Sequence, residues 1–83
     1  MIEFELRKVD NSTWETTITR YGICCHAYIF VKERVFWRTL SVAYESNPKY
    51  VRHKWNYMKW ECRTVKDAVI QYVEDLCDYY STT

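Results

Sequence analysis

Residues 65–80 read Val-Lys-Asp-Ala-Val-Ile-Gln-Tyr-Val-Glu-Asp-Leu-Cys-Asp-Tyr-Tyr, and this stretch decides the fold. Apolar residues recur here at steps of three and four, which places them on one face of an α-helix: Val65, Ala68, Val69, Tyr72, Val73, Leu76 and Tyr80. The opposite face is polar: Lys66, Asp67, Gln71, Glu74, Asp75 and Asp78. Thr64 precedes the run with Asp67 three residues later, an approximate capping box with Asp in place of Glu or Gln. We therefore predict an amphipathic helix over Val65–Tyr80.

Such a short helix is marginal in water by itself, so its apolar face must be covered by the residues that precede it. Ile2–Leu6 alternates apolar and charged residues, which predicts a half-buried strand. Trp14–Thr19 alternates again and is rich in Thr, which favours a second strand, antiparallel to the first. Ile23–Val31 is apolar on both faces apart from His26, which predicts a central strand.

The second half of the sheet is less clearly patterned. Val35–Tyr44 suits either a strand or a helix, and its β-branched and aromatic residues favour a strand. Tyr50–Cys62 predicts a fifth strand, with a break near Asn56 left open. Turns are predicted at 10–13, 21–22, 32–34 and 45–49, where polar residues, the only Gly or the only Pro occur. We expect one α+β domain over residues 1–83, a mostly antiparallel sheet of four to five strands with a C-terminal amphipathic helix on one face.

Charge is segregated along the chain, although the net charge is only +1. Residues 34–66 contain eight Lys or Arg and two Asp or Glu, whereas residues 67–83 contain four acids and no base. No apolar run approaches the about 20 residues that span a bilayer. The first five residues alternate and are acidic, unlike a signal peptide. We therefore expect a cytoplasmic protein, in the cell that makes it or in an infected host.

The candidate metal ligands and nucleophiles are few: Cys24, Cys25, Cys62, Cys77, His26 and His53. Cys24 and Cys25 are neighbours on a strand and point to opposite faces, so they are poor joint ligands. A zinc site built from Cys25, Cys62 and Cys77, or a disulfide from Cys24 or Cys25 to Cys62, is the alternative. Because a cytosolic setting disfavours disulfides, we predict four reduced, core-filling cysteines and no bound metal.

No residue pattern indicates catalysis. His26 and Cys25 diverge as strand neighbours, so they do not form a nucleophile and its base. With a single Gly, the chain has no phosphate-binding loop. Carboxylates gather on the polar helix face, where we expect them to be solvated, and weak binding of a divalent ion is the alternative: Asp67, Glu74, Asp75 and Asp78. We expect neither an enzyme nor a cofactor.

Residues 49–60 interleave basic and aromatic side chains, and the chain as a whole is 18% aromatic. Exposed aromatics are common in protein interfaces, so we predict binding to another protein or protein complex. The candidate contact residues are Arg52, Lys54, Trp55, Tyr57, Lys59, Trp60, Glu74, Asp75 and Asp78. The alternative is single-stranded nucleic acid, because Lys and Arg side chains bind phosphates and aromatic side chains stack on nucleobases.

The chain resembles, in type, the small inhibitors that phages make against bacterial defence or host enzymes, anti-CRISPR proteins among them. The resemblance lies in small size, a single domain, scarcity of Gly and the lack of a catalytic motif. No residue role is implied by it. It implies a protein partner in a host or defence complex. An acidic helix face can also mimic nucleic-acid charge and occupy a basic groove on such a partner.

Overall fold

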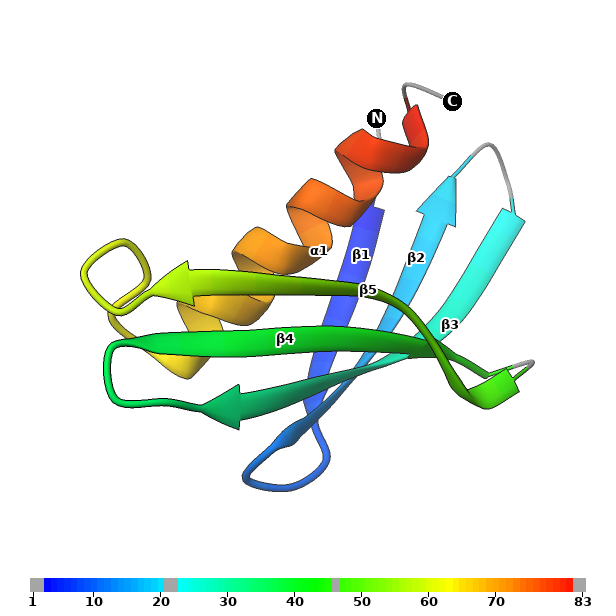
Figure 1. Cartoon of the computed structure of the whole chain (residues 1–83). Helices are drawn as coiled ribbons and strands as arrows, with labels where there is room; N and C mark the ends of the chain where they lie inside the picture. The colour runs from blue at the N-terminus through cyan, green and yellow to red at the C-terminus, as the bar shows by residue number, and fades with distance from the viewer. Residues whose placement is uncertain (1–2, 21–22, 46, 82–83) are drawn as a thin grey trace.

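The structure is a computed structural model that describes residues 3–20, 23–45 and 47–81, and side chains within 3–19, 25–45 and 53–79. Strands and one helix follow in the order β1 (Glu3–Lys8), β2 (Thr13–Arg20), β3 (Ile23–Glu33), β4 (Trp37–Tyr44), β5 (Asn47–Met58) and α1 (Val65–Ser81). The α+β fold predicted from the sequence is confirmed (Figure 1).

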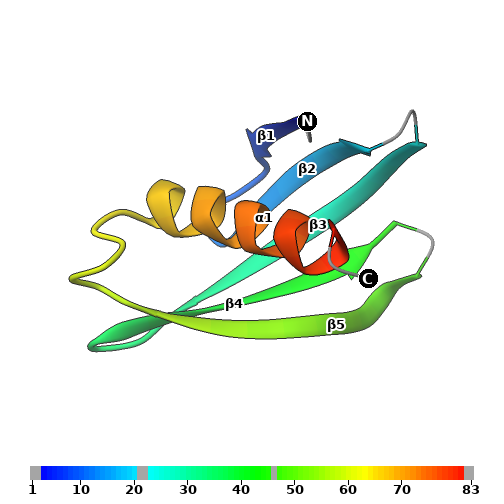
Figure 2. The ribbon, with the colours of Figure 1, turned by 90° about the horizontal axis from the view of Figure 1, so that it is seen from above.

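The sheet is a meander in which each strand pairs with the next. Five strands lie in the order β1-β2-β3-β4-β5, and every neighbouring pair is antiparallel. Twist makes β4 and β5 run across the direction of β1 and β2 in Figure 1. Seen from above, α1 lies over the sheet between its two edge strands, β1 and β5 (Figure 2). No helix in the described part of the chain has the length and apolarity needed to cross a membrane.

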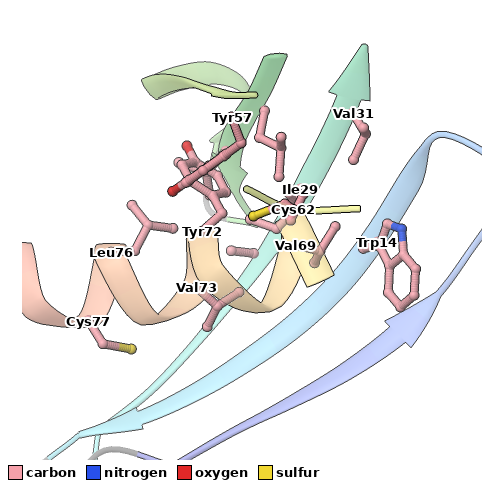
Figure 3. Close-up of a cluster of buried hydrophobic side chains, with 14 residues drawn as sticks. Trp14, Ile29, Val31, Tyr57, Cys62, Val69, Tyr72, Val73, Leu76 and Cys77 are labelled. Atoms are coloured by element: carbon pink, nitrogen blue, oxygen red, sulfur yellow. The ribbon is translucent and has the colours of Figure 1, made fainter. Parts of the chain in front are cut away.

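The apolar stripe of α1 forms the centre of the core, as its spacing predicts. Its central residues are all buried: Ala68, Val69, Tyr72, Val73 and Leu76. The helix begins as predicted, since the Thr64 hydroxyl accepts a hydrogen bond of 3.1 Å from the Asp67 N–H. Cys77 is also buried although it lies outside the predicted stripe, and Figure 3 shows its side chain beside this cluster.

Strands β2 to β5 add buried side chains to the same core: Trp14 from β2, Ala27, Ile29 and Val31 from β3, Leu40 and Val42 from β4, and Tyr57 from β5. Phe4 and Leu6 of β1 pack against it partly buried. Cross-strand register aligns these residues, because Trp14 pairs with Ile29 and Ile29 with Val42. Full burial of a side chain such as Ile29 contributes about 1.5–3 kcal/mol. The prediction that Ile23–Val31 is a central strand is confirmed.

The turn between the third and fourth strands lies later in the sequence than predicted. β3 continues to Glu33, so the turn lies at 34–36 and not at 32–34. Glu33 pairs with Arg38 across the sheet, and Arg38 Nε donates to the Glu33 carboxylate at 2.6 Å, which extends the ladder by a residue pair. The strand interpretation of Val35–Tyr44 is confirmed from Trp37 onward.

The predicted loop at 45–49 is wrong from Asn47 onward, and the fifth strand predicted over Tyr50–Cys62 begins and ends earlier than that. β5 begins at Asn47 and ends at Met58, and it passes through Asn56 without a break. A Pro at position 48 is compatible with a strand here because β5 is an edge strand, where the missing N–H need not pair. The predicted bend at 21–22 lies outside the described residues.

Charge placed in the helix stripe should unfold the protein. Val69→Asp or Leu76→Asp buries an unpaired carboxylate in a domain whose whole stability is about 5–10 kcal/mol. Glu74→Ala, on the exposed side of α1, should change the free energy of unfolding by less than about 0.5 kcal/mol. Urea denaturation of the three variants checks this, and equal losses at both kinds of position would show that the stripe is not the buried face.

Removing a buried hydroxyl should stabilise the protein. Thr16 is buried beneath the helix, and its Oγ1 has no hydrogen-bond partner among the described residues. Thr16→Val keeps the shape and removes the unpaired polar atom, so the free energy of unfolding should rise by about 1 kcal/mol. The matched change on the opposite face of β2, Thr17→Val at a half-buried position, should have a smaller effect. A lower melting temperature for Thr16→Val would contradict the structure.

Candidate functional site

Two loops meet at one end of the sheet, the β3–β4 turn at 34–36 and the β5–α1 connection at 59–64. The Lys59 N–H donates to the Phe36 carbonyl at 2.9 Å, and Trp37 pairs with Met58 beside it. The Arg34 N–H donates to the Trp37 carbonyl at 2.9 Å and closes the turn. Both loops lie at the same end of the molecule in Figure 1, next to the start of α1.

Arg38, in β4, ties the β5–α1 connection to the end of β3. Its buried guanidinium donates to the Cys62 carbonyl at 2.6 Å and to the Arg63 carbonyl at 3.2 Å, besides its bond to Glu33. Lys59 Nζ lies 3.0 Å from the other oxygen of the Glu33 carboxylate. Partial burial opposes ionisation of Glu33, but Lys59 and Arg38 outweigh it and keep the pKa of this carboxyl below its usual value.

Large apolar side chains project from this anchored end. The exposed fractions are 80% for Val35, 63% for Phe36, 70% for Trp60 and 39% for Trp37. We call these four residues the aromatic end. Single exposed apolar residues are ordinary on a protein surface, whereas a group of them at one end of the sheet, from the turn, the start of β4 and the connection, marks an interaction site.

The predicted contact residues of β5 are divided between the two faces of the sheet. Trp55 and Tyr57 lie on the helix side, since their partners Leu40 and Arg38 are buried there, and their rings stack at 6.4 Å. Lys54 is exposed on the opposite face. The side chain of Arg52 lies outside the described residues. The interleaved sequence therefore does not place these bases and aromatics on one surface.

Tyr57 is buried and belongs to the core. Its ring meets that of Tyr72 edge to face at 6.5 Å, and its hydroxyl donates to the Asp75 carboxylate. Burial raises the pKa of Tyr57 strongly, and the adjacent Asp75 carboxylate adds to the effect. The Tyr72 hydroxyl donates to the His53 carbonyl at 3.1 Å, so α1 is tied to β5 by two tyrosines.

The acidic side of α1 is smaller than the sequence predicts. Asp75 is half-buried and accepts hydrogen bonds from Tyr57 and, at 3.0 Å, from Gln71, so it is not simply solvated. Glu74 and Asp78 are exposed. Among the described residues no group of three His, Cys, Asp or Glu is placed to hold a metal ion. None of the three thiols described is in a disulfide: Cys62 and Cys77 are buried, as predicted for core-filling cysteines, whereas Cys25 is exposed and does not fill the core.

A polar cluster on the sheet face opposite the helix was not found by sequence reasoning. His26 Nε2 lies 2.5 Å from Glu15 Oε1 and its Nδ1 lies 3.0 Å from Glu45 Oε2, while Arg7 pairs with Glu15. The His26 carbonyl also accepts the Glu45 N–H at 3.0 Å. The His26 and Tyr28 rings lie 5.2 Å apart. Partial burial opposes the charged imidazole, but Glu15 and Glu45 outweigh it and raise the pKa of His26.

The aromatic end was itself only partly found from the sequence. Trp60 is among the predicted contact residues, whereas the sequence predicts a strand for Val35, Phe36 and Trp37, which is correct only for Trp37. Three successive bulky apolar residues cannot all point to one face of a strand. That run, next to the polar residues 32–34, is the signal that could have located an exposed turn.

Stability should fall as the pH rises through the pKa of His26. Folding surrounds this imidazole with carboxylates, so its pKa is raised from the usual 6.5. Such a group contributes stability that is complete below its unfolded pKa and is lost as the pH rises through its folded pKa. Urea denaturation between about pH 5.5 and about pH 8.5 measures the change while the carboxyls stay ionised.

His26→Gln should flatten the dependence of stability on pH in that window. His53→Gln is the control, because it removes the other histidine of the chain and leaves the cluster intact. If His26→Gln retained the full dependence and His53→Gln lost it, the linkage to Glu15 and Glu45 would be wrong.

The chain was compared with protein families, with curated proteins and with solved structures. No family, no curated protein and no solved structure matches it. A function for the chain therefore has to be argued from the residues of its own surface.

Proposed function

We propose that this chain is a non-enzymatic interaction protein that binds another protein through its aromatic end. The observation that carries the proposal is the exposure of Val35, Phe36, Trp37 and Trp60 at one end of the sheet. Aromatic residues dominate the affinity of many protein interfaces when a partner buries them. None of these four belongs to the buried core, so packing within the chain does not account for them.

The backbone under the aromatic end favours binding at low entropic cost. The Lys59 N–H to Phe36 carbonyl bond joins the two loops, and Arg38 fastens the second loop to β4. A preformed surface loses less conformational freedom on association than a flexible one. The free energy gained by burying the aromatic side chains is then available for affinity.

Single-stranded nucleic acid is the second candidate, and the arrangement of β5 gives it less support. Trp55 and Tyr57 lie on the helix side and Lys54 on the other. Stacking needs an accessible ring, and Tyr57 is buried. Lys59 is paired with Glu33, which reduces its availability for a phosphate.

The partner class that we propose is a protein of a host or defence complex, and the compartment is the cytoplasm of the producing cell or of an infected host. This part of the proposal rests on the size and composition of the chain. The acidic residues Glu74 and Asp78 remain candidates for a second contact with the same partner, because both are exposed on α1.

Truncating the aromatic end should abolish capture of a protein partner. Tagged wild type and a Phe36→Ser, Trp60→Ser variant are incubated with nuclease-treated bacterial lysate, and the bound proteins are quantified by mass spectrometry. The wild type should retain a specific protein that the variant loses. Because both side chains are largely exposed, the melting temperature should stay the same.

Val9→Ser with Tyr79→Ser is the matched control, since both residues are exposed apolar side chains that do not belong to the aromatic end: Val9 lies between β1 and β2, and Tyr79 lies in the last turn of α1. This variant should capture the same protein as the wild type. A labelled oligothymidine is titrated in parallel at low and high salt. Strong, salt-dependent oligothymidine binding that Phe36→Ser and Trp60→Ser remove, without a captured protein, would reverse the order of the two candidates.

A further inference from the structure

We infer that the aromatic end recognises an apolar protein segment flanked by carboxylates. This inference rests on the proposed function and specifies the chemistry of the partner. Two observations carry it. The four apolar side chains are surrounded mainly by basic residues, and some of these basic residues have no ion-pair partner within the described part of the chain.

Basic residues outnumber acidic ones around the aromatic end. Residues 32–38 and 59–66 contain six basic and two acidic residues, a net charge of +4. The acidic residues are both engaged within the protein. Glu33 is bound by Arg38 and Lys59, and the Glu61 carboxylate accepts the Met58 N–H at 3.3 Å. Arg38 is buried and paired with Glu33, and the two acids do not balance the charge of the remaining bases of these segments.

Two arginines have no counter-ion among the described residues. Arg34 lies in the turn with Phe36, and Arg63 lies in the connection with Trp60, and the side chains of both are exposed without an ion pair there. A partner that covers the aromatic end must pair these guanidinium groups or bury them unpaired, which opposes binding. The planar arginine fork binds a carboxylate through two parallel hydrogen bonds.

Phosphates also pair with arginine, so the two arginines alone would fit either a nucleic acid or an acidic protein segment. The apolar side chains beside them favour the protein segment. Val35 is the most exposed of the four, and an aliphatic side chain has no ring face on which a nucleobase could stack. Its burial requires an apolar surface, which a protein segment supplies. Apolar contact at the centre and carboxylates at the rim satisfy both Val35 and the arginines.

The acidic residues of α1 lie away from this surface. The helix starts next to the aromatic end and runs away from it, which carries the exposed Glu74 and Asp78 toward the other end of the molecule (Figure 1). Asp78 lies in the last turn of the helix, which contains no basic residue, so its charge adds to the negative end of the helix dipole. A chain that is basic at one end and acidic at the other is oriented by the field of an acidic partner before contact.

Synthetic peptides of defined charge test the inference directly. A set of dye-labelled peptides shares the same Leu and Phe positions, and the remaining positions are Glu, Gln or Lys. An oligothymidine of equal length is the polyanion control. Fluorescence anisotropy at low and high salt measures binding of each ligand to three proteins. These are the wild type, the double variant Arg34→Glu, Arg63→Glu, and the charge-matched control Lys8→Glu, Lys54→Glu. Tryptophan emission of the wild type, with Phe36→Ser, Trp60→Ser for comparison, reports whether the aromatic end is covered.

The Glu peptide should bind best, weaken with salt, and shift the tryptophan emission of the wild type to the blue. Arg34→Glu with Arg63→Glu should weaken it by at least about tenfold, and Lys8→Glu with Lys54→Glu by less than about threefold. Equal binding of the Glu and Gln peptides, tighter binding of oligothymidine, or no peptide binding would each overturn the inference. The proposed function is decided separately by protein capture, so a charge-independent partner captured through Phe36 and Trp60 would leave it standing while the inference fails.

Discussion

Burial of the apolar stripe of α1 is the constraint on which the rest of the structure depends. A helix of this length does not persist alone in water, and the sheet supplies the surface that covers it. Tyr72 lies at the centre of this contact, with its ring against Tyr57 and its hydroxyl on the His53 carbonyl (Figure 3). The same contact brings α1 to the edge strand β5 and satisfies polar groups there. Packing and hydrogen bonding therefore select one position for the helix.

The helix covers one face of the sheet, so a partner can bind only at the opposite face, the exposed side of the helix, the edges or the ends of the molecule. The opposite face is held by ion pairs among Arg7, Glu15, His26 and Glu45, which join β1, β2, β3 and the residue after β4. These ion pairs are partly exposed to solvent, which screens them and keeps the contribution of each one to stability modest. The aromatic end has no such internal role, and its exposure is a cost that binding would recover.

Arg38 shows how a charged residue can serve the fold and prepare a surface at once. Its buried guanidinium is bonded to the Glu33 carboxylate and to the Cys62 and Arg63 carbonyls. These partners satisfy a group that would be costly to bury alone. In turn, the Arg38 guanidinium neutralises the Glu33 carboxylate and fixes the β5–α1 connection. Arg34 and Arg63 are left as the positive charges beside the apolar side chains.

The sequence by itself determined the helix, the alternating first strands and the central strand, because those segments repeat at the period of a single element and need no knowledge of their neighbours. It did not determine the limits of β5, since Asn47 and Pro48 read as a loop until the edge position of the strand made them acceptable. It also did not show that Tyr57 is buried and Trp60 exposed, because both are aromatic residues in the same run of alternating basic and aromatic side chains. Only the tertiary structure decided that Tyr57 enters the core and bonds to Asp75 while Trp60 joins Phe36 at an exposed end. The physical reason is that exposure depends on which residues distant in sequence come to lie against a side chain, and no local period contains that information.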